Sequence, residues 1–345
     1  MLHFSLLFNF FFRRKRKLLQ HVCTNSMRCY AIKQSTAPKV LFFGTDNFSL
    51  PSLQMLQKQN LEIGVVTSFK SPANCVRSYA EHQRLPLYRW PVTVEQCLTY
   101  DLGVVVSFGH MIPSYLISAF PSGMINAHAS LLPRWRGAAP IIYAIMEGDT
   151  KTGVSIMQIH PHHFDVGPLL AQREFSIKPD VYMPELHTAL SHLGADLLVD
   201  TIKNLSEKLL NAQPQDDKIA TYAPKISPHI AEIIWSKHSA TELYARHRAL
   251  YGFKSLTTRF LDKQVQVLDV KLPERPLCLS MEPGCFSYQR IRKALIIGCA
   301  KDSQLEVSRI RMEGKRPMSA QDFSNGFFKR THMLQFTENK KVACC

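Results

Sequence analysis

Zinc-binding and disulfide patterns are missing from this sequence of 345 residues, although it contains nine cysteines. The cysteines are scattered and odd in number, none forms a Cys-x-x-Cys pair, and no Cys/His spacing matches a zinc site. We therefore expect a reduced compartment and no metal. A Gly-x-Gly-x-x-Gly loop is missing as well. Gly44 stands alone after the first apolar segment, which argues against a dinucleotide-dependent oxidoreductase.

Acidic side chains are missing from the N-terminus as far as Asp46. An apolar run over residues 2–12 comes first, and the basic run 13–17 follows it. A secretory signal has the reverse order, and a membrane-spanning helix needs roughly 20 apolar residues. An acid-free, Arg-rich N-terminus instead predicts a mitochondrial transit peptide over residues 1–36, and with it a location in the matrix. A tail without a targeting role, or a wrongly assigned start, is the alternative.

Positive charge is unevenly distributed along the chain, whose formal net charge is +15. Residues 37–224 contain 14 basic and 16 acidic side chains, whereas residues 225–345 contain 21 basic and 11 acidic ones. A near-neutral part beside a basic part indicates a catalytic body with an arm for a polyanion such as a nucleic acid. A solvated basic face without a partner is the alternative.

Short apolar segments alternate with helix-length connections from Lys39 to about residue 210. This spacing indicates βαβ units and predicts a Rossmann-like, doubly wound and mostly parallel sheet in an α/β fold. Residues 184–210 predict one long amphipathic helix. The apolar segments lie at residues 40–43, 63–66, 102–106, 124–125 and 154–159.

The composition changes near residue 211 to glutamine, aspartate, proline and alanine, which predicts a linker over residues 213–228. Beyond it, a capped helix over residues 239–250 and several alternating segments predict a smaller antiparallel β domain, a sandwich or a barrel. We therefore expect a catalytic domain over residues 37–212 and a basic β domain over residues 229–345.

Asn126 and His128 follow the apolar pair at residues 124–125. Open parallel sheets bind ligands at the carboxyl ends of their strands, and residues two apart point the same way if the strand persists. An amide N–H can stabilise an oxyanion, and an imidazole can transfer a proton near neutral pH. Asp165, beyond a later strand, could orient His128. A hydrogen-bonded histidine at a strand end and an aspartate in a turn are the alternatives.

Residues 126–140 contain the most informative motif, Asn-Ala-His-Ala-Ser-Leu-Leu-Pro-Arg-Trp-Arg-Gly-Ala-Ala-Pro. It resembles the signature of the formyltetrahydrofolate-dependent formyltransferases, and its Arg-Trp-Arg-Gly extension resembles the methionyl-tRNA branch of that family. With its leader, the chain is similar to the mitochondrial members. Further similar segments lie at residues 43–45, 104–109, 152–158, 165–167 and 221–226.

The resemblance implies a role for each matching residue. Asn126, His128 and Asp165 would form the catalytic trio, in which the amide and the protonated imidazole stabilise charge on the formyl oxygen. The donor would be 10-formyltetrahydrofolate, without a metal. Six residues would contact the folate, namely Ser130, Leu131, Leu132, Pro133, Phe108 and Gly109.

The resemblance also implies a tRNA partner. Bacterial members grip tRNA with a longer basic insertion than the stretch at residues 68–77 provides here, so we expect affinity from the C-terminal domain, whose family counterpart resembles an OB-type barrel. For Arg134 and Arg136, an intramolecular ion pair is the alternative. Nine residues are the predicted tRNA contacts, namely Arg134, Arg136, Lys225, Arg309, Arg311, Lys315, Arg316, Lys329 and Arg330.

The implied reaction is formyl transfer to the α-amino group of methionyl-tRNA, which prepares it for initiation of mitochondrial translation. Formyl transfer from the same donor to a small amine, or hydrolysis of the formyl-folate, is the alternative. A non-catalytic RNA-binding protein would also fit the charge but would leave the trio unused. We expect a monomer without a membrane partner.

Overall fold

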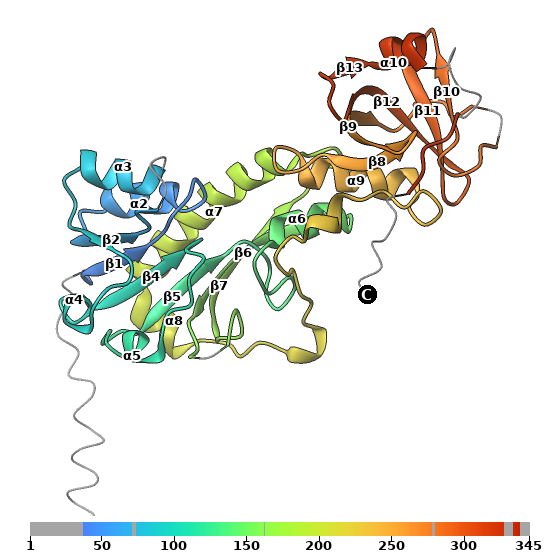
Figure 1. The fold of residues 1–345 in the computed structure, drawn as a ribbon. Helices are drawn as coiled ribbons and strands as arrows, with labels where there is room; N and C mark the ends of the chain where they lie inside the picture. The colour runs from blue at the N-terminus through green and yellow to red at the C-terminus, as the bar shows by residue number, and fades with distance from the viewer. Residues whose placement is uncertain (1–36, 71–73, 162, 278–279, 328–333, 339–345) are drawn as a thin grey trace, which may run out of the picture. The chain divides into compact units, whose positions relative to one another are not determined.

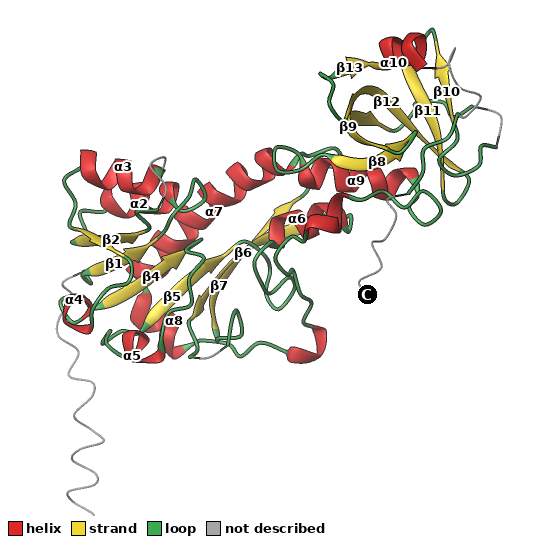
Figure 2. Ribbon diagram, viewed as in Figure 1, coloured by secondary structure: helices red, strands yellow, loops and turns green. Residues whose placement is uncertain are grey.

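The computed structural model describes residues 37–70, 74–161, 163–277, 280–327 and 334–338. The predicted transit peptide lies outside these residues and stays a prediction. Within them, no helix combines the length and the apolar character needed to cross a membrane. Two β-sheets organise the described chain, as Figure 1 and Figure 2 show.

The N-terminal sheet has seven strands in the order β3-β2-β1-β4-β5-β6-β7. From β3 to β5, each neighbouring pair is parallel. This confirms the predicted Rossmann-like, mostly parallel sheet. The strands are β1 (Val40–Phe43), β2 (Ile63–Thr67), β3 (Leu87–Arg89), β4 (Leu102–Val106), β5 (Met124–His128), β6 (Lys151–Gln158) and β7 (Leu169–Ser176).

The last two strands run against their neighbours, because β6 pairs antiparallel with β5 and β7 pairs antiparallel with β6. His128 ends β5 and lies opposite Ser155, so β6 begins beyond the carboxyl end of β5. The connection that contains α6 (Pro140–Met146) therefore leaves and re-enters the sheet at the same end of the strands.

Alternating side chains of β1 divide the core of this module into two layers. Val40 and Phe42 belong to a cluster with residues of α2, α3 and α7, whereas Leu41 and Phe43 belong to one with residues of α4 and α5. Strands that are buried on both faces need helices on both sides. The helices are α2 (Leu50–Gln57), α3 (Cys75–His82), α4 (Val94–Cys97), α5 (Ser114–Ile117), α7 (Met183–Lys203) and α8 (Leu205–Leu210).

The single long helix predicted over residues 184–210 is in fact two, α7 and α8, which meet at Asn204. Its φ of −112° and ψ of 27° leave the helical region, and its side chain donates a 3.0 Å hydrogen bond to the carbonyl of Asp200. Local bonds of this kind compete with helix propagation. Since apolar residues such as Leu205 and Leu209 continue to face the core, periodicity alone could not reveal the break.

The C-terminal sheet is antiparallel, with the order β10-β11-β12-β9-β8 and with β13 paired to β12. The predicted capped helix before it is confirmed as α9, where Ser239 and Glu242 form a capping box. The elements are the short 3-10 helices η1 (Asp217–Ile219) and η2 (Pro228–Ala231), then α9 (Ala240–Leu250), β8 (Leu256–Phe260), β9 (Lys263–Lys271), β10 (Phe286–Gln289), β11 (Ala294–Cys299), β12 (Ser303–Met312), β13 (Met318–Ser319) and α10 (Ala320–Phe327).

A short segment at residues 334–338 joins the two edges of this sheet. Thr337 bridges to Arg259 in β8, and Gln335 bridges to Cys285 next to β10. β8 and β10 are the outermost strands of the sheet, so the segment satisfies both edges and closes it. The predicted antiparallel β-barrel is confirmed in this form.

Replacing Phe336 with alanine should lower the free energy of unfolding by about 3–5 kcal/mol. Phe336 is 2% exposed, and its ring centroid lies 4.4 Å from that of Phe286 and 6.0 Å from that of Trp235. The substitution leaves a cavity beside the closing segment. Urea unfolding followed by circular dichroism gives the value, with the fully exposed Ile291→Ala as the control. A loss below about 1 kcal/mol would show that this segment does not hold the barrel together.

Candidate functional site

A cavity of about 740 Å³ lies at the carboxyl ends of β1, β4 and β5. Strand order reverses between β1 and β4, and open α/β sheets bind their ligands at such a switch point. The lining comes mainly from the loops after β1 and β4, the end of β5, the start of α6 and the loop after β6. The start of α7 and residues 225, 226 and 253 complete it. A cavity in this position is the candidate ligand site.

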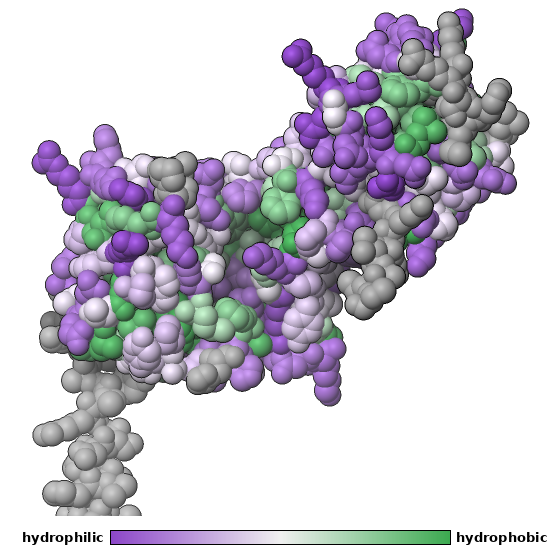
Figure 3. All heavy atoms as spheres, viewed as in Figure 1, coloured by the Kyte–Doolittle hydropathy of each residue, from purple (hydrophilic) through white to green (hydrophobic). Residues whose placement is uncertain are grey.

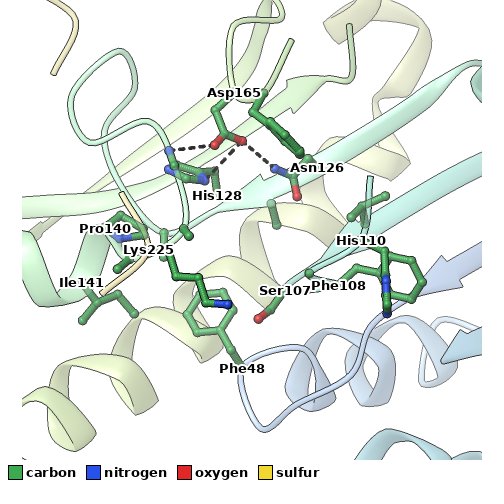
Figure 4. Close-up of a pocket in the computed structure, with 18 of the residues that line it drawn as sticks. Phe48, Ser107, Phe108, His110, Asn126, His128, Pro140, Ile141, Asp165 and Lys225 are labelled. Carbon is green, nitrogen blue, oxygen red and sulfur yellow. Dashed lines mark hydrogen bonds and ion pairs between the residues drawn. The ribbon is translucent and has the colours of Figure 1, made fainter. Parts of the chain in front are cut away.

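Asn126, His128 and Asp165 meet at one wall of this cavity. The strand β5 persists through His128, so Asn126 and His128 point the same way. Nδ2 of Asn126 lies 3.4 Å from Oδ1 of Asp165, and Nδ1 of His128 lies 3.6 Å from the same oxygen. Figure 4 shows the three side chains converging. Both His128 and Asp165 are nearly buried, so the two side chains face each other with little water between them.

The ring of His128 is held by its second nitrogen. Nε2 lies 2.9 Å from the backbone carbonyl oxygen of Trp135. A carbonyl oxygen only accepts, so this contact places a hydrogen on Nε2. The proton that the ring can gain or lose is therefore the one on Nδ1, which faces Asp165. This arrangement directs proton transfer toward the side of the ring where the trio meets.

The backbone around Asp165 is unusual. Its φ of 55° lies in the left-handed region, which is rare for a residue with a side chain. The other carboxylate oxygen, Oδ2, accepts a 2.9 Å hydrogen bond from the backbone N–H of Gly137. Donors therefore reach the carboxylate from both β5 and the loop that follows it. Strained residues persist only where the surroundings hold them, and they are frequent in functional sites.

Phe108 and Gly109, which were expected at the folate, line the cavity. The Phe108 ring packs edge-on against Trp90 and Phe43, with centroid distances of 5.1 and 5.4 Å. His110 stacks on Trp90 at 5.7 Å. Phe108 and His110 line the cavity, where a flat heteroaromatic ligand can pack against them, and Phe43 and Trp90 pack against these two rings.

Charged groups line the same cavity. The Lys225 side chain extends toward Phe48 and Ser107 in Figure 4. The carboxylate of Asp46 accepts hydrogen bonds from the Ser107 hydroxyl and from the backbone N–H of Phe48. Burial lowers the pKa of His187, and the nearby Asp46 carboxylate opposes that shift. The cavity therefore presents an exposed cation and an anchored anion to a ligand.

Four residues predicted to contact the folate do not line the cavity, namely Ser130, Leu131, Leu132 and Pro133. The Ser130 hydroxyl donates to the carbonyl of Arg134, and its own carbonyl accepts from the Ser155 hydroxyl, both at 2.6 Å. The N–H of Leu132 donates to the same hydroxyl at 3.0 Å. The polar groups of Ser130 and Leu132 are used inside the protein, where they shape the loop that follows His128. The folate contact of the four residues stays a prediction.

Arg134 and Arg136, predicted to meet tRNA, form intramolecular pairs. Arg134 donates to Asp149, with Nε at 2.8 Å from Oδ2. Arg136 is 3% exposed, and its Nη2 lies 2.8 Å from Oδ1 of Asp217 and 2.9 Å from Oε1 of Gln215. A guanidinium buried and paired in this way matches the intramolecular alternative, and a tRNA contact of Arg136 stays an untested prediction. For Arg134, the ion-pair alternative describes the structure.

The basic face predicted on the last long strand is present in β12. Arg309 and Arg311 are exposed, whereas Ile310 and Met312 between and beyond them are buried. Figure 3 shows strongly hydrophilic side chains protruding from the C-terminal module. Lys315 and Arg316 are exposed as well. Two further predicted contacts, Lys329 and Arg330, lie outside the described residues.

Sequence reasoning missed three groups of this site. Gly137 lies inside the motif that it singled out, but only the fold shows that its N–H reaches Asp165. Asp46 precedes a helix in a turn-forming sequence, which was the available clue. Gln215 stands in the predicted linker, where nothing marked it. Among the described residues, no group of three or more His, Cys, Asp or Glu side chains could hold a metal ion.

Two family models match this chain. The formyl transferase model matches residues 91–202, and the model of the formyl transferase C-terminal domain matches residues 225–328. Together with the fold and the cavity, these matches define the class of protein as a formyltransferase.

Curated relatives refine this result. The mitochondrial methionyl-tRNA formyltransferase of Rattus norvegicus is 36% identical over 87% of this chain and 81% of its own length. The enzyme of the same name from Homo sapiens is 36% identical over 86% of this chain and 79% of its own. The methionyl-tRNA formyltransferase of Parvibaculum lavamentivorans is 35% identical over 84% and 97%. The chain belongs to the methionyl-tRNA formyltransferase family.

Solved structures share the fold at low identity. HypX from Aquifex aeolicus in complex with tetrahydrofolic acid has a TM-score of 0.58 at 15% identity, over 89% of this chain and 51% of its own. This chain thus spans about half the length of HypX. The N-formyltransferase from Helicobacter canadensis, with folinic acid and dTDP-3-aminofucose, has a TM-score of 0.61 at 16% identity, over 80% and 99%.

Replacing Gly137 with alanine should lower the free energy of unfolding by more than about 3 kcal/mol, because two costs add. Its φ is +121°, and a Cβ there would lie 2.6 Å from the carbonyl oxygen of Ala223. Gly148→Ala is the matched control, since Gly148 also has a positive φ, +74°, but has open space around it. That control should lose only about 1–2 kcal/mol. Equal losses in urea unfolding would show that the close approach to Ala223 is unimportant.

Proposed function

We propose that this chain transfers the formyl group of 10-formyltetrahydrofolate to the α-amino group of methionyl-tRNA, producing formylmethionyl-tRNA. One observation supports this above all: Asn126, His128 and Asp165 converge at the wall of a cavity at the switch point of the sheet. Membership of the family supplies the identity of the donor and the acceptor.

The cavity suits a reduced folate. Its volume of about 740 Å³ lies within the range of small-molecule sites. Phe108 and Gly109 form part of the wall for the pterin ring, which lies against the aromatic cluster. Gly109 has no side chain and a φ of 68°, so its backbone can approach the ligand closely. The formyl group then points toward the trio.

The trio supports the transfer without a nucleophile of its own. The neutral amine of the methionyl group attacks the formyl carbon, and negative charge develops on the formyl oxygen. The amide of Asn126 and the protonated Nδ1 of His128 stabilise that charge. The bond between the formyl carbon and the folate nitrogen then breaks. The proton that the amine loses is passed on to this leaving nitrogen, and Asp165 holds His128 in place for that transfer.

The tRNA is held at two places. Lys225 lines the cavity, and in this proposal its ammonium group binds a phosphate near the acceptor end. Phosphate contacts farther along the tRNA come from the basic face of the C-terminal module and give affinity without base reading. The basic residues proposed for this face are Arg309, Arg311, Lys315 and Arg316. Lys329 and Arg330, which lie outside the described residues, stay predicted tRNA contacts.

The cellular setting follows from the relatives and the leader. The mammalian relatives are mitochondrial enzymes, which supports a mitochondrial location for this chain. Within mitochondria, we assign it to the matrix, where the formylated tRNA would initiate translation. The chain acts as a monomer without a membrane partner in this proposal.

Single-turnover formylation of methionyl-tRNA tests the trio. His128→Ala and Asp165→Ala should each slow the transfer by about 10²- to 10⁴-fold, because proton transfer and charge stabilisation are lost. Formylmethionyl-tRNA is quantified after mixing excess enzyme and 10-formyltetrahydrofolate with labelled methionyl-tRNA.

His82→Ala is the matched control, because His82 is an exposed histidine outside the cavity lining. Unchanged rates in His128→Ala and Asp165→Ala would remove the trio from the mechanism. If donor is consumed with small amines or water while methionyl-tRNA stays unmodified, the acceptor is wrong and the folate chemistry stands.

Neutralising the basic face should weaken tRNA binding and its dependence on salt. Replacing Arg311, Lys315 and Arg316 with glutamine removes up to three phosphate contacts. Each lost contact should reduce the slope of log K against log salt concentration by about 1. Filter binding of methionyl-tRNA over a range of potassium chloride concentrations gives the slopes.

The control triple removes the same charge from exposed positions of the N-terminal module, with glutamine at Lys58, Arg84 and Lys203. Its slope should match that of the unmodified protein. Equal slopes in the two triples would mean that the C-terminal face is merely solvated.

A further inference from the structure

The amide of Gln215 holds the backbone of the loop that contains Asp165. Its Nε2 lies 3.0 Å from the carbonyl oxygen of Asp165 and 2.8 Å from that of Gly167. Gly167 cannot carry a side chain there, since a Cβ would lie 1.8 Å from the carbonyl oxygen of Gln158. The two hydrogen bonds therefore clamp a tightly packed turn on both sides of residue 166.

Arg136 sets the orientation of that amide. Its Nε and Nη2 lie 3.0 and 2.9 Å from Oε1 of Gln215. A guanidinium only donates, so the amide oxygen must face Arg136 and the NH₂ group must face the two carbonyls. Arg136 is nearly buried and is itself paired with Asp217. A flipped amide would place two donors against a guanidinium.

The segment that contains Gln215 is attached to the catalytic sheet. The N–H of Gln213 and the carbonyl of Leu169 pair at 2.9 Å, and the reverse pair lies at 2.7 Å. Farther on, the N–H of Ala223 donates to the carbonyl of Arg136 at 2.7 Å. The part of the chain predicted as a linker therefore begins as a strand-like strap, which fixes the position of Gln215.

We propose that Gln215, oriented by Arg136, is a positioning residue for the reaction and acts through Asp165. The carboxylate of Asp165 reaches Asn126 and His128 from a left-handed backbone conformation. The clamp on its own carbonyl maintains that conformation. This inference rests on the proposed role of Asp165. It extends the site to the segment that contains Gln215, outside the sheet. Arg136 of the Arg-Trp-Arg-Gly motif then acts indirectly, because it orients the residue that positions Asp165.

Gln215→Glu tests the clamp with almost no change in size. The carboxylate still accepts from Arg136 but cannot donate to the two carbonyls. Turnover of methionyl-tRNA by the full chain should fall about tenfold to a hundredfold, as a displacement near 1 Å would cause, while both KM values change less than about twofold. Gln213→Glu is the matched control, since the Gln213 side chain is exposed and donates to the carbonyl of Asn211. Gln215→Met is a neutral second variant and should lose turnover similarly.

A double-mutant cycle separates positioning from a general structural role. In Asp165→Ala, the further change Gln215→Glu should have no additional effect on the single-turnover rate, because the residue that it positions is gone. Independent, multiplicative losses would overturn the inference, as would unchanged turnover in both Gln215 variants. If Asp165→Ala is itself fully active, the proposed trio fails. If Asp165→Ala is inactive while the Gln215 variants are active, only the positioning role fails.

Discussion

The site depends on the burial of one carboxylate, that of Asp165. A carboxylate removed from water needs hydrogen-bond donors from the protein. The Asp165 side chain is nearly buried, and its donors come from different segments of the chain: the amide of Asn126 in β5 and the N–H of Gly137 in the next loop. The ring of His128 lies beside the same carboxylate. An unpaired buried charge would be costly, so this group ties the loop after β6 to the edge of the sheet. The geometry that satisfies the charge also brings an amide and an imidazole to the wall of one cavity. Stability and chemistry therefore depend on the same contacts.

The N-terminal module, which contains the seven-stranded sheet, and the C-terminal module, which contains the antiparallel sheet, differ in charge. The N-terminal module is close to neutral and contains the cavity at the switch point of its sheet, where loops meet at the carboxyl ends of buried strands. The C-terminal module has most of the positive charge of residues 37–345 and places arginines on the outer face of β12. A low-dielectric pocket is suited to stabilising one developing charge, whereas a solvated basic face is suited to a polyanion of many charges. Keeping these environments apart lets both requirements be met in one chain.

The loop from residue 129 to residue 140 shows how one motif can serve a site indirectly. Its serine and leucines were expected to contact the folate and its arginines to contact tRNA, yet most of these groups are used within the protein. Trp135 supplies the carbonyl that fixes the His128 ring, and Gly137 supplies an N–H to the carboxylate. A sequence motif records that residues are needed together. It does not distinguish those that touch a ligand from those that shape the loop, because both depend on the same close packing.

The sequence by itself determined the class of fold and the alternation of β12, because apolar periodicity is a local property. Asn126 and His128 stood out by their place after an apolar segment, whereas Asp165 joined them through the family resemblance. The sequence could not determine that β6 runs antiparallel, that Asn204 breaks a helix without interrupting the apolar pattern, or that residues 334–338 close the barrel. These outcomes depend on where chain segments meet, and meeting points are set by long-range packing. The same reason applies to the site. Gln215 lies 50 residues beyond Asp165 in the chain and 79 residues beyond Arg136, yet it contacts both. Only the tertiary structure decides which side chains at such distances become neighbours.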